Sequence, residues 1–370
     1  MTLRIEKVEG KRALLEAFHL PHSLYKNDPY YVSPLWSDFK LLFDPKNPFY
    51  LHARADLFVA REGGRLVGSA AYIQDENFIR FHGEKTAHFG FFECANRPDV
   101  AAALFDRVEE EGRKAGMDRI IGPLNYSTNE SCGLLVEGFD SIPYMMMPYN
   151  PPYYAELLEG RGYGKAKDLF AFIAPVNDAW IARLERISRE AYAKGNITVR
   201  PVNLKHLADE LKIVSSIYNS AWEKNWGFVP MTDPEMEFMA KRLKPVIIPD
   251  LLLIAFVDGN PAAFIMNLPN VNQVLKHIKG HLNPWALAKV LYHSRKVDML
   301  RLLTMGVKAE YRKMGLDACL YYEGAKAGLR RKFKEVEFSW ILEDNLIMQK
   351  AVRVMGGRKY KTYRVFQKSL

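Results

Sequence analysis

A short basic loop in the second half of the chain has the residue types needed to bind phosphate groups. It follows an apolar run at 300–307 that predicts a buried strand, and it precedes residues 316–333, whose apolar spacing predicts a helix. The loop contains Arg312, Lys313 and Gly315. The first turn of a helix has unpaired N–H groups and a partial positive charge, and both attract a pyrophosphate. We therefore expect this strand–loop–helix to hold the diphosphate of a cofactor.

One residue of this loop has the wrong charge for a phosphate site. A carboxylate at Asp317, about 5 Å from a phosphate, would cost about 3 kcal/mol at an effective dielectric constant near 20. A carboxylate turned outward would instead be stabilised by the helix N-terminus. A capped helix start without any ligand is the alternative. The predicted cofactor-binding residues of this segment are Gly306, Val307, Arg312, Lys313, Met314, Gly315, Leu316 and Asp317.

Strands and helices follow one another in the same order in both halves, so the fold class expected is α/β with mixed sheets. Each half predicts a strand, a helix, a hairpin, a strand, a helix, a strand and a helix. The pair Gly63-Gly64 marks the first hairpin. Because 370 residues exceed a typical single core, we expect two domains. Their predicted bounds are 1–176 and 197–370, joined by a linker helix at 177–196.

The second half resembles the GNAT acyltransferase superfamily. The superfamily motif at this loop is Arg/Gln-x-x-Gly-x-Gly/Ala, which Arg312 and Gly315 match and from which Asp317 departs. Asn345 then opens a helix that a glycine pair closes. The resemblance covers 197–370, and the whole chain is similar to a bacterial tandem-GNAT family of undefined substrate. It implies two GNAT-type acyl-CoA N-acyltransferase domains, with acetyl-CoA or another acyl-CoA as co-substrate and Asn345 beside its pantetheine.

The same resemblance implies that an amine attacks the thioester directly while a backbone N–H at the end of the strand 300–307 polarises the carbonyl. The customary acid of the superfamily is a tyrosine seven residues after the motif asparagine. Counting from Asn345 and from Asn150 gives Val352 and Leu157, which cannot donate a proton. The candidates that remain as catalytic residues are Glu310 and Tyr360, with a surface turn and core packing as their respective alternatives.

The first half lacks the chemistry of the phosphate loop. Its equivalent loop, 96–99, has no glycine, and Pro98 removes a backbone donor. We expect this half to keep the fold without the phosphate site. It has instead a long polar segment at 122–154, and polar loop residues often contact ligands; packing at a domain interface is the alternative. The predicted substrate-binding residues are Asn125, Tyr126, Asn129, Glu130, Tyr149 and Tyr153, together with Trp340 of the second half.

Composition places the chain among globular proteins. Hydrophobic residues make up 48% and charged residues 26%, which is not typical of disorder. No apolar run predicts a membrane span, and the N-terminus does not resemble a signal peptide. The three cysteines are widely spaced, and the nine histidines show no paired spacing. We expect a cytoplasmic protein without a metal site.

Charge divides unevenly between the halves. Residues 1–185 carry 21 basic and 26 acidic side chains, for a net −5, whereas residues 186–370 carry 31 and 17, for a net +14. A field of this sign attracts polyanions such as CoA phosphates, RNA or an anionic membrane surface. A solvated basic face without a partner is the alternative.

These observations favour an acyl-CoA-dependent N-acyltransferase, with acetyl-CoA as the preferred donor and a small amine or amino-acid-like acceptor. One alternative is an aminoacyl-tRNA-dependent transferase resembling Fem-type ligases; the basic half suits nucleic acid, but no heptad run predicts their coiled coil. The other is a non-catalytic ligand-binding protein on a degenerate GNAT frame, which Asp317 and the missing tyrosine favour. The sequence predicts no oligomeric state.

Overall fold

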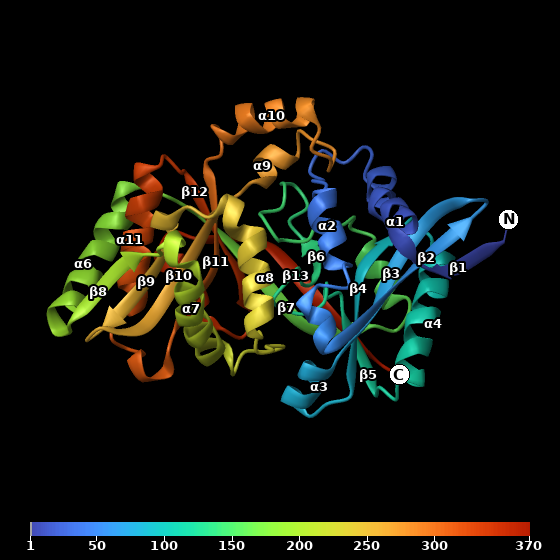
Figure 1. Ribbon diagram of the computed structural model, residues 1–370, viewed down its shortest axis with the longest axis horizontal. Helices are drawn as coiled ribbons and strands as arrows, with labels where there is room; N and C mark the ends of the chain where they lie inside the picture. The colour runs from blue at the N-terminus through green and yellow to red at the C-terminus, as the bar shows by residue number, and fades with distance from the viewer. Residues whose placement is uncertain (1) are drawn as a thin grey trace. The chain divides into compact units, whose positions relative to one another are not determined.

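A computed structural model describes residues 2–370 of the chain (Figure 1). Residue 1, where the first expected domain begins, lies outside the described residues. The backbone contacts divide the chain into two units. The first unit comprises the residues up to Leu169 together with Asn272–Tyr292 and Lys361–Leu370, and the second comprises Phe170–Val271 and His293–Tyr360. The expected boundaries at 176 and 197 stay predictions.

In the first unit the strands are ordered β1-β2-β3-β4-β5-β13. Neighbouring strands are antiparallel except β4 and β5, which are parallel. β6 pairs with β13 beside this path. The strands are β1 (Leu3–Lys7), β2 (Ala53–Glu62), β3 (Arg65–Asp75), β4 (Thr86–Cys94), β5 (Arg119–Gly122), β6 (Leu134–Glu137) and β13 (Arg358–Ser369).

Helices cover both faces of the strands in the first unit. α4 packs its apolar stripe on one face, with Leu104 and Phe105 fully buried, and α1 packs on the other face. The hairpin between β2 and β3 confirms the turn predicted at Gly63-Gly64, where both glycines have positive φ. The helices are α1 (Gly10–Leu24), α2 (Trp36–Leu42), η1 (Pro48–Leu51), α3 (Glu76–His82), α4 (Pro98–Lys114), α5 (Tyr154–Glu159), α9 (Asn272–Leu275) and α10 (Pro284–Ser294).

In the second unit the strand order is β12-β11-β10-β9-β8. β11 and β12 are parallel, and the other pairs are antiparallel. A tight turn at Asp258 and Gly259 joins β9 to β10, which confirms the hairpin predicted in this half of the chain. The strands are β7 (Gly164–Pro175), which passes from the first unit into the second, β8 (Ile197–Pro201), β9 (Leu252–Val257), β10 (Asn260–Pro269), β11 (Met299–Val307) and β12 (Glu335–Leu342).

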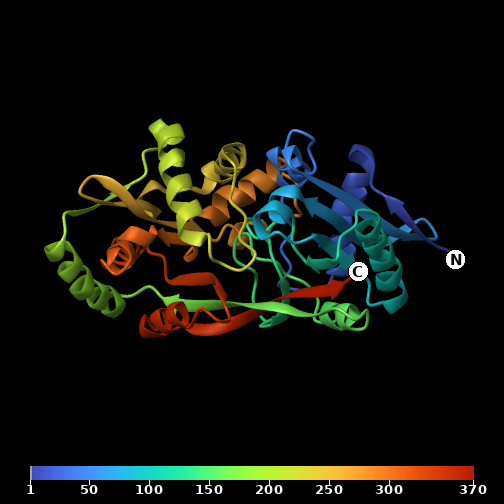
Figure 2. The ribbon, with the colours of Figure 1, turned by 90° about the horizontal axis from the view of Figure 1, so that it is seen from below.

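The second unit has helices on both faces of its strands. α11 lies on one face and α6 packs against α11, whereas α7 covers the other face (Figures 1 and 2). This places a helix N-terminus directly after β11, as the sequence predicted. The helices are α6 (Asp178–Lys194), η2 (Leu204–His206), α7 (Leu207–Trp222), α8 (Asp233–Leu243), η3 (Lys244–Val246), η4 (Pro249–Leu251), η5 (Ala309–Tyr311), α11 (Leu316–Arg330) and α12 (Leu346–Val354).

Candidate functional site

The two parallel strands of the second unit separate part of the way along their length. Their pairing runs from Met299↔Glu335 to Leu302↔Phe338, although both strands continue for several residues. On its other side β11 stays paired with β10 as far as Val307, with an irregularity opposite Met266 and Asn267 that leaves Leu303 without a register partner. Among residues 2–370, no strand pairs with the β12-facing edge of β11 beyond Leu302. This edge offers backbone groups to an extended ligand.

The N-terminus of α11 is free of side-chain caps. Gly315 occupies the N-cap position with φ of 79°, and a glycine has no side chain that could cap the first turn. Asp317 is exposed on this turn, so its carboxylate lies at the surface of the helix. The first N–H groups of an uncapped helix remain available to an anion. The start of α11 therefore has no cap from its own N-cap residue.

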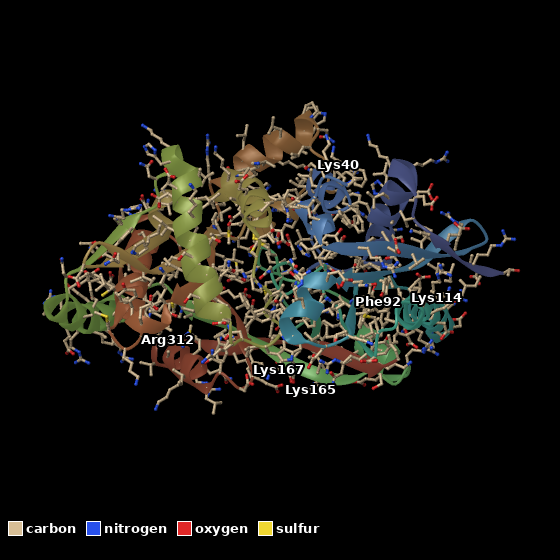
Figure 3. All side chains as sticks on the ribbon, turned by 60° about the horizontal axis from the view of Figure 1, so that its bottom comes forward. Lys40, Phe92, Lys114, Lys165, Lys167 and Arg312 are labelled. Carbon is tan, nitrogen blue, oxygen red and sulfur yellow. The ribbon has the colours of Figure 1, made fainter. Side chains whose placement is uncertain are left out.

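Basic residues flank this helix start. Arg312, labelled in Figure 3, is exposed and its Nη2 donates to the carbonyl of Ala221 at 3.3 Å. Lys313 is exposed and has a positive φ of 70°, and Met314 is half-buried. Leu316 is buried in the core, so it contributes its backbone rather than its side chain.

Gly315 is required by packing as well as by conformation. A Cβ at this position would lie 2.8 Å from the Cβ of Ala191 on α6, which runs beside α11 (Figures 1 and 2). Gly306 of β11 is restricted in the same way, because its Cβ would lie 2.3 Å from Cζ3 of Trp222 on α7. The sequence predicted glycine for close approach of a ligand, and the structure adds close approach of two helices.

A buried polar cluster lies where β11 and β12 begin to separate. Arg301 and Glu337 are 1% and 0% exposed, and Arg301 Nε lies 3.7 Å from Glu337 Oε1. Ser339 connects them, since its hydroxyl accepts from Arg301 Nε at 3.0 Å and donates to Glu337 Oε1 at 2.6 Å. Tyr360 donates its phenol proton to Glu337 Oε2, and the Arg301 guanidinium lies over the ring of Trp340. The cluster brings two predicted site residues, Tyr360 and Trp340, to the same place.

The other predicted residues of the second unit lie at the surface. Glu310 is exposed in η5, next to the basic loop. Asn345 is exposed and caps α12, since its Oδ1 accepts from the N–H of Met348 at 3.1 Å. Its side chain is thus engaged by its own helix.

An apolar cavity of about 20 Å³ lies between α11 and the paired part of β11 and β12. It is bounded by Tyr321, Gly324 and Phe338, among others. This volume holds about one water molecule, so the cavity by itself accommodates no acyl chain.

Two full-length relatives decide the family of the chain. The bacterial ceramide synthase of Caulobacter vibrioides (strain NA1000 / CB15N) is 35% identical over 376 residues, which cover 100% of this chain and 98% of the relative. Protein YghO of Escherichia coli (strain K12) is 35% identical over 364 residues, covering 96% and 93%. The chain belongs to the bacterial ceramide synthase family. No protein-family model matches it.

Solved structures show which fold this ceramide synthase family member has. A tandem GNAT protein from the clavulanic acid biosynthesis pathway matches with a TM-score of 0.60 at 14% identity, over 100% of this chain and 98% of the other. A GCN5-related N-acetyltransferase from Sphaerobacter thermophilus matches with a TM-score of 0.54 at 12% identity, covering 99% and 95%. The fold is that of tandem GNAT proteins, as the sequence predicted.

In this member of the ceramide synthase family, the equivalent strand edge of the first unit is occupied by its own residues, and the equivalent helix start carries acidic side chains. β4 and β5 also separate, after His88↔Ile121, but the N–H of Leu124 donates to Phe89 O at 2.8 Å and the N–H of Phe91 donates to Asn125 Oδ1 at 2.8 Å. At the start of α4 the Arg97 guanidinium pairs with Asp99 and Glu62. The first two contacts occupy a strand edge whose counterpart is open in the second unit. The ion pairs place the carboxylates of Asp99 and Glu62 beside the start of α4, where Pro98 also removes a backbone donor.

The predicted substrate-binding residues of the segment 122–154 are scattered rather than convergent. Asn125 closes the β4 edge, and Tyr126 is 2% exposed, with its hydroxyl donating to Leu42 O at 2.6 Å. Tyr149 donates to Asp28 and Tyr153 to Cys94 O. Asn129 and Glu130 are half-buried in the turn that begins at Ser127. Their role in binding an acceptor stays a prediction.

Sequence reasoning missed three charged residues inside strands. Arg301, Glu337 and Glu93 lie within β11, β12 and β4, among mostly apolar residues. A charged residue in the middle of a buried strand is the signal that could have found them, because such residues are rarely buried without a partner.

Glu93 has two tyrosines as donors in the first unit. The hydroxyls of Tyr25 and Tyr154 each donate to its Oε2 at 2.8 Å. Burial raises the pKa of Glu93 to about 7, although both hydrogen bonds oppose the rise. The group therefore changes its charge near neutral pH.

We expect Glu93→Gln to stabilise the protein increasingly from pH 4.5 to pH 7, by up to about 3 kcal/mol. In this window the unfolded wild type has lost its proton while the folded state keeps it, so wild-type stability falls as pH rises. Glutamine stays neutral and still accepts from both tyrosines. Urea unfolding of both proteins across this pH range measures the effect. The difference between them is needed because burial lowers the pKa of His88 to about 4, which gives the opposite slope. A difference that does not change with pH would contradict the prediction.

No group of three or more His, Cys, Asp or Glu side chains with the geometry of a metal site occurs among residues 2–370. Over the same described residues, no helix has the length and apolar character needed to span a bilayer.

Proposed function

We propose that this protein is an acyl-CoA-dependent N-acyltransferase whose second unit holds the acyl-CoA. The observation that carries the proposal is the uncapped, glycine-led start of α11 beside the unpaired edge of β11. In this reading the first turn of α11, with Arg312 and Lys313, binds the diphosphate, and the β11 edge binds the pantetheine amides. Glu310 in η5 and Asn345 at the start of α12 are the further residues that we propose for this site.

Two buried polar atoms support a ligand between the separated strands. Thr304 Oγ1 on β11 and Trp340 Nε1 on β12 have no hydrogen-bond partner. Buried polar groups in folded proteins almost always have one, and a missing partner calls for a ligand or a water molecule. The position of these atoms, one on each strand, fits a polar chain that runs between the strands.

The acceptor we propose is the amine of a long-chain amino alcohol, and the donor a fatty acyl-CoA. This choice comes from the 35% identical relative that is named as a ceramide synthase, because a ceramide is such an amine in N-acylated form. Acetyl-CoA with a small amine or amino acid is the second pair to test. An exposed Asp317 removes one reason to regard the site as inactive.

Different residues of the second unit have different roles in the proposed acyl transfer. The amine nitrogen bonds to the thioester carbon, the carbon–sulfur bond breaks, the amine loses a proton and the thiolate gains one. A backbone N–H of β11 near Gly306 or Val307 stabilises the charge on the carbonyl oxygen. Tyr360, which is oriented by Glu337, is the proposed proton donor to the thiolate.

Binding of CoA is tested with two glycine variants. With CoA at 100 times its Kd, the wild type should gain about 2.7 kcal/mol of stability. Gly315→Ala should weaken CoA binding about tenfold because the added Cβ meets Ala191 and displaces the loop. At the same CoA concentration its gain should then be about 1.4 kcal/mol. Thermal unfolding with and without CoA measures both values.

Gly356→Ala is the matched control. Gly356 has a similar φ of 82°, and nothing lies within 4 Å of its added Cβ. Both variants therefore suffer the same left-handed backbone cost of about 1 kcal/mol, but only the first should lose stabilisation by CoA. Absence of any shift of the wild type with CoA or acyl-CoA would remove the proposal.

Release of free CoA thiol, followed for different donor and acceptor pairs, tests the reaction itself. Turnover with fatty acyl-CoA and a long-chain amino alcohol would support the proposed pair, and turnover only with acetyl-CoA and small amines would replace it. Turnover only with aminoacyl-tRNA would favour the Fem-like alternative. CoA binding without transfer to any amine would favour a non-catalytic ligand-binding protein.

A further inference from the structure

A long insertion joins β10 to β11 and carries an exposed apolar helix. The connection runs from residue 270 to residue 298, whereas the equivalent connection in the first half, between β3 and β4, occupies only residues 76–85. It contains α9 and α10, and Figure 1 shows α10 with no other element drawn on its outer side. Neither the fold nor the proposed acyl transfer explains this helix.

The helix α10 places its small residue inward and its large apolar residues outward. Ala286 is 6% exposed, whereas Trp285 is 82%, Leu287 53% and Leu291 63% exposed. Consecutive helix residues are about 100° apart, so these exposed side chains and Tyr292 fall within about 160° on the side opposite Ala286. Leu282, just before the helix, is 57% exposed. This arrangement is the reverse of an ordinary surface helix.

The segment that precedes α10 is held in place, so the exposure is built into the fold. Asn272 Nδ2 donates to the carbonyls of Pro143 and Tyr144 at 3.0 and 3.1 Å. The N–H of Trp36 donates to Gly280 O at 2.8 Å, and Phe18 packs on the ring of His281. These contacts, all within the first unit, fix the start of α10 with its apolar side turned out.

The charge of the insertion is positive except for Asp298, its last residue, which pairs with Lys334. Residues 259–297 contain five lysines and arginines and no aspartate or glutamate. Lys276, Lys279 and Lys289 are exposed, and Lys289 lies on α10 itself. An apolar face with tryptophan and tyrosine, flanked by lysines, is typical of helices that lie in a membrane interface. Lysine side chains reach from such a position to the phosphates of lipid headgroups.

We propose that α10 docks this protein on an anionic lipid bilayer, with Trp285, Leu287 and Leu291 inserted among the headgroups. The binding is peripheral, since the helix has 11 residues. A second copy of the chain is a poorer partner, because a two-fold contact of α10 with itself would bring like charges together. The proposal does not depend on acyl transfer.

Flotation of the full chain with vesicles tests the proposal. We expect binding to vesicles of phosphatidylglycerol mixed with phosphatidylcholine, weaker binding to phosphatidylcholine alone, and a marked loss at high salt. The double variant Trp285→Ser/Leu287→Ser should bind at least about tenfold more weakly. The double variant Lys276→Glu/Lys279→Glu should bind these vesicles more weakly, by about fivefold or more for each lysine replaced.

The matched control is Leu51→Ser/Phe81→Ser. Leu51 and Phe81 are also exposed, at 78% and 39%, and belong to the same unit, but they lie on other elements. This control should bind vesicles as the wild type does. Equal vesicle binding by the wild type and the α10 variants would overturn the proposal, as would no binding by the wild type. A change in molecular mass in solution caused by the α10 variants would assign the helix to a protein contact instead. Stabilisation by CoA should be unchanged in every variant, which separates this test from that of acyl transfer.

Discussion

Replacing Tyr360 with phenylalanine is expected to lower kcat about 100-fold and to leave the KM for acyl-CoA nearly unchanged. The change removes only the hydroxyl, which donates to Glu337 in a cluster at the point where β11 and β12 separate. The ring remains, and the cofactor loop at Arg312–Gly315 is untouched. Initial rates of thiol release, measured with the donor and acceptor pair that turns over, give both constants.

Tyr322→Phe is the control for this experiment. Tyr322 is half-buried on α11 and contacts Lys326, away from the polar cluster. It should keep wild-type rates. If Tyr360→Phe also keeps its kcat, Tyr360 is not the proton donor, whereas an increase in KM alone would make it a binding residue. Neither result would contradict the proposed CoA site.

Removing the guanidinium of the buried Arg301–Glu337 pair is expected to lower the free energy of unfolding by about 3 to 5 kcal/mol. In Arg301→Met the carboxylate of Glu337, which is 0% exposed, loses the guanidinium that lies 3.7 Å away. Methionine has a similar apolar stem, so little volume is lost. Urea unfolding of the variant measures the cost.

A double variant separates the effect of the two charges from the effect of packing. The double variant Arg301→Met/Glu337→Met removes both charges, so it should be more stable than Arg301→Met alone by about 2 kcal/mol or more. Glu337→Gln provides a third measurement if Arg301→Met fails to fold. If the loss of stability in the double variant equals the sum of the losses in the single variants, Arg301 and Glu337 do not stabilise the protein as a pair.

Much of the fold followed from local signals. The Gly63-Gly64 pair and the Asp258-Gly259 pair each specify a tight turn, and each turn joins two strands as a hairpin. The alternation of strands and helices then located the start of α11, because a glycine after a buried strand marks where such a helix begins. Local sequence is sufficient for features of this kind, since their cause lies within a few residues.

Features with a distant cause were not predictable. The hydroxyl of Tyr126 donates to Leu42 O, and its ring stacks on Phe49 at 4.5 Å, although the polar loop around it predicts only a ligand contact. Both partners are more than 70 residues away in the sequence. Arg301 and Glu337 were missed for the same reason, because Arg301 is paired with residues of another strand, Glu337 and Ser339. The inward turn of Ala286 on α10 likewise depends on what lies beneath the helix.

The last strand has a consequence for biosynthesis. Residues Lys361–Leu370 belong to the first unit, where β13 pairs with β5 and β6. Phe366, fully buried there, follows every residue of the second unit in the chain. The sheet of the first unit is therefore completed only after the second unit has been synthesised, and until then β5 presents an open edge to other chains. If the N-terminal half were expressed separately, the edge of β5 would stay open.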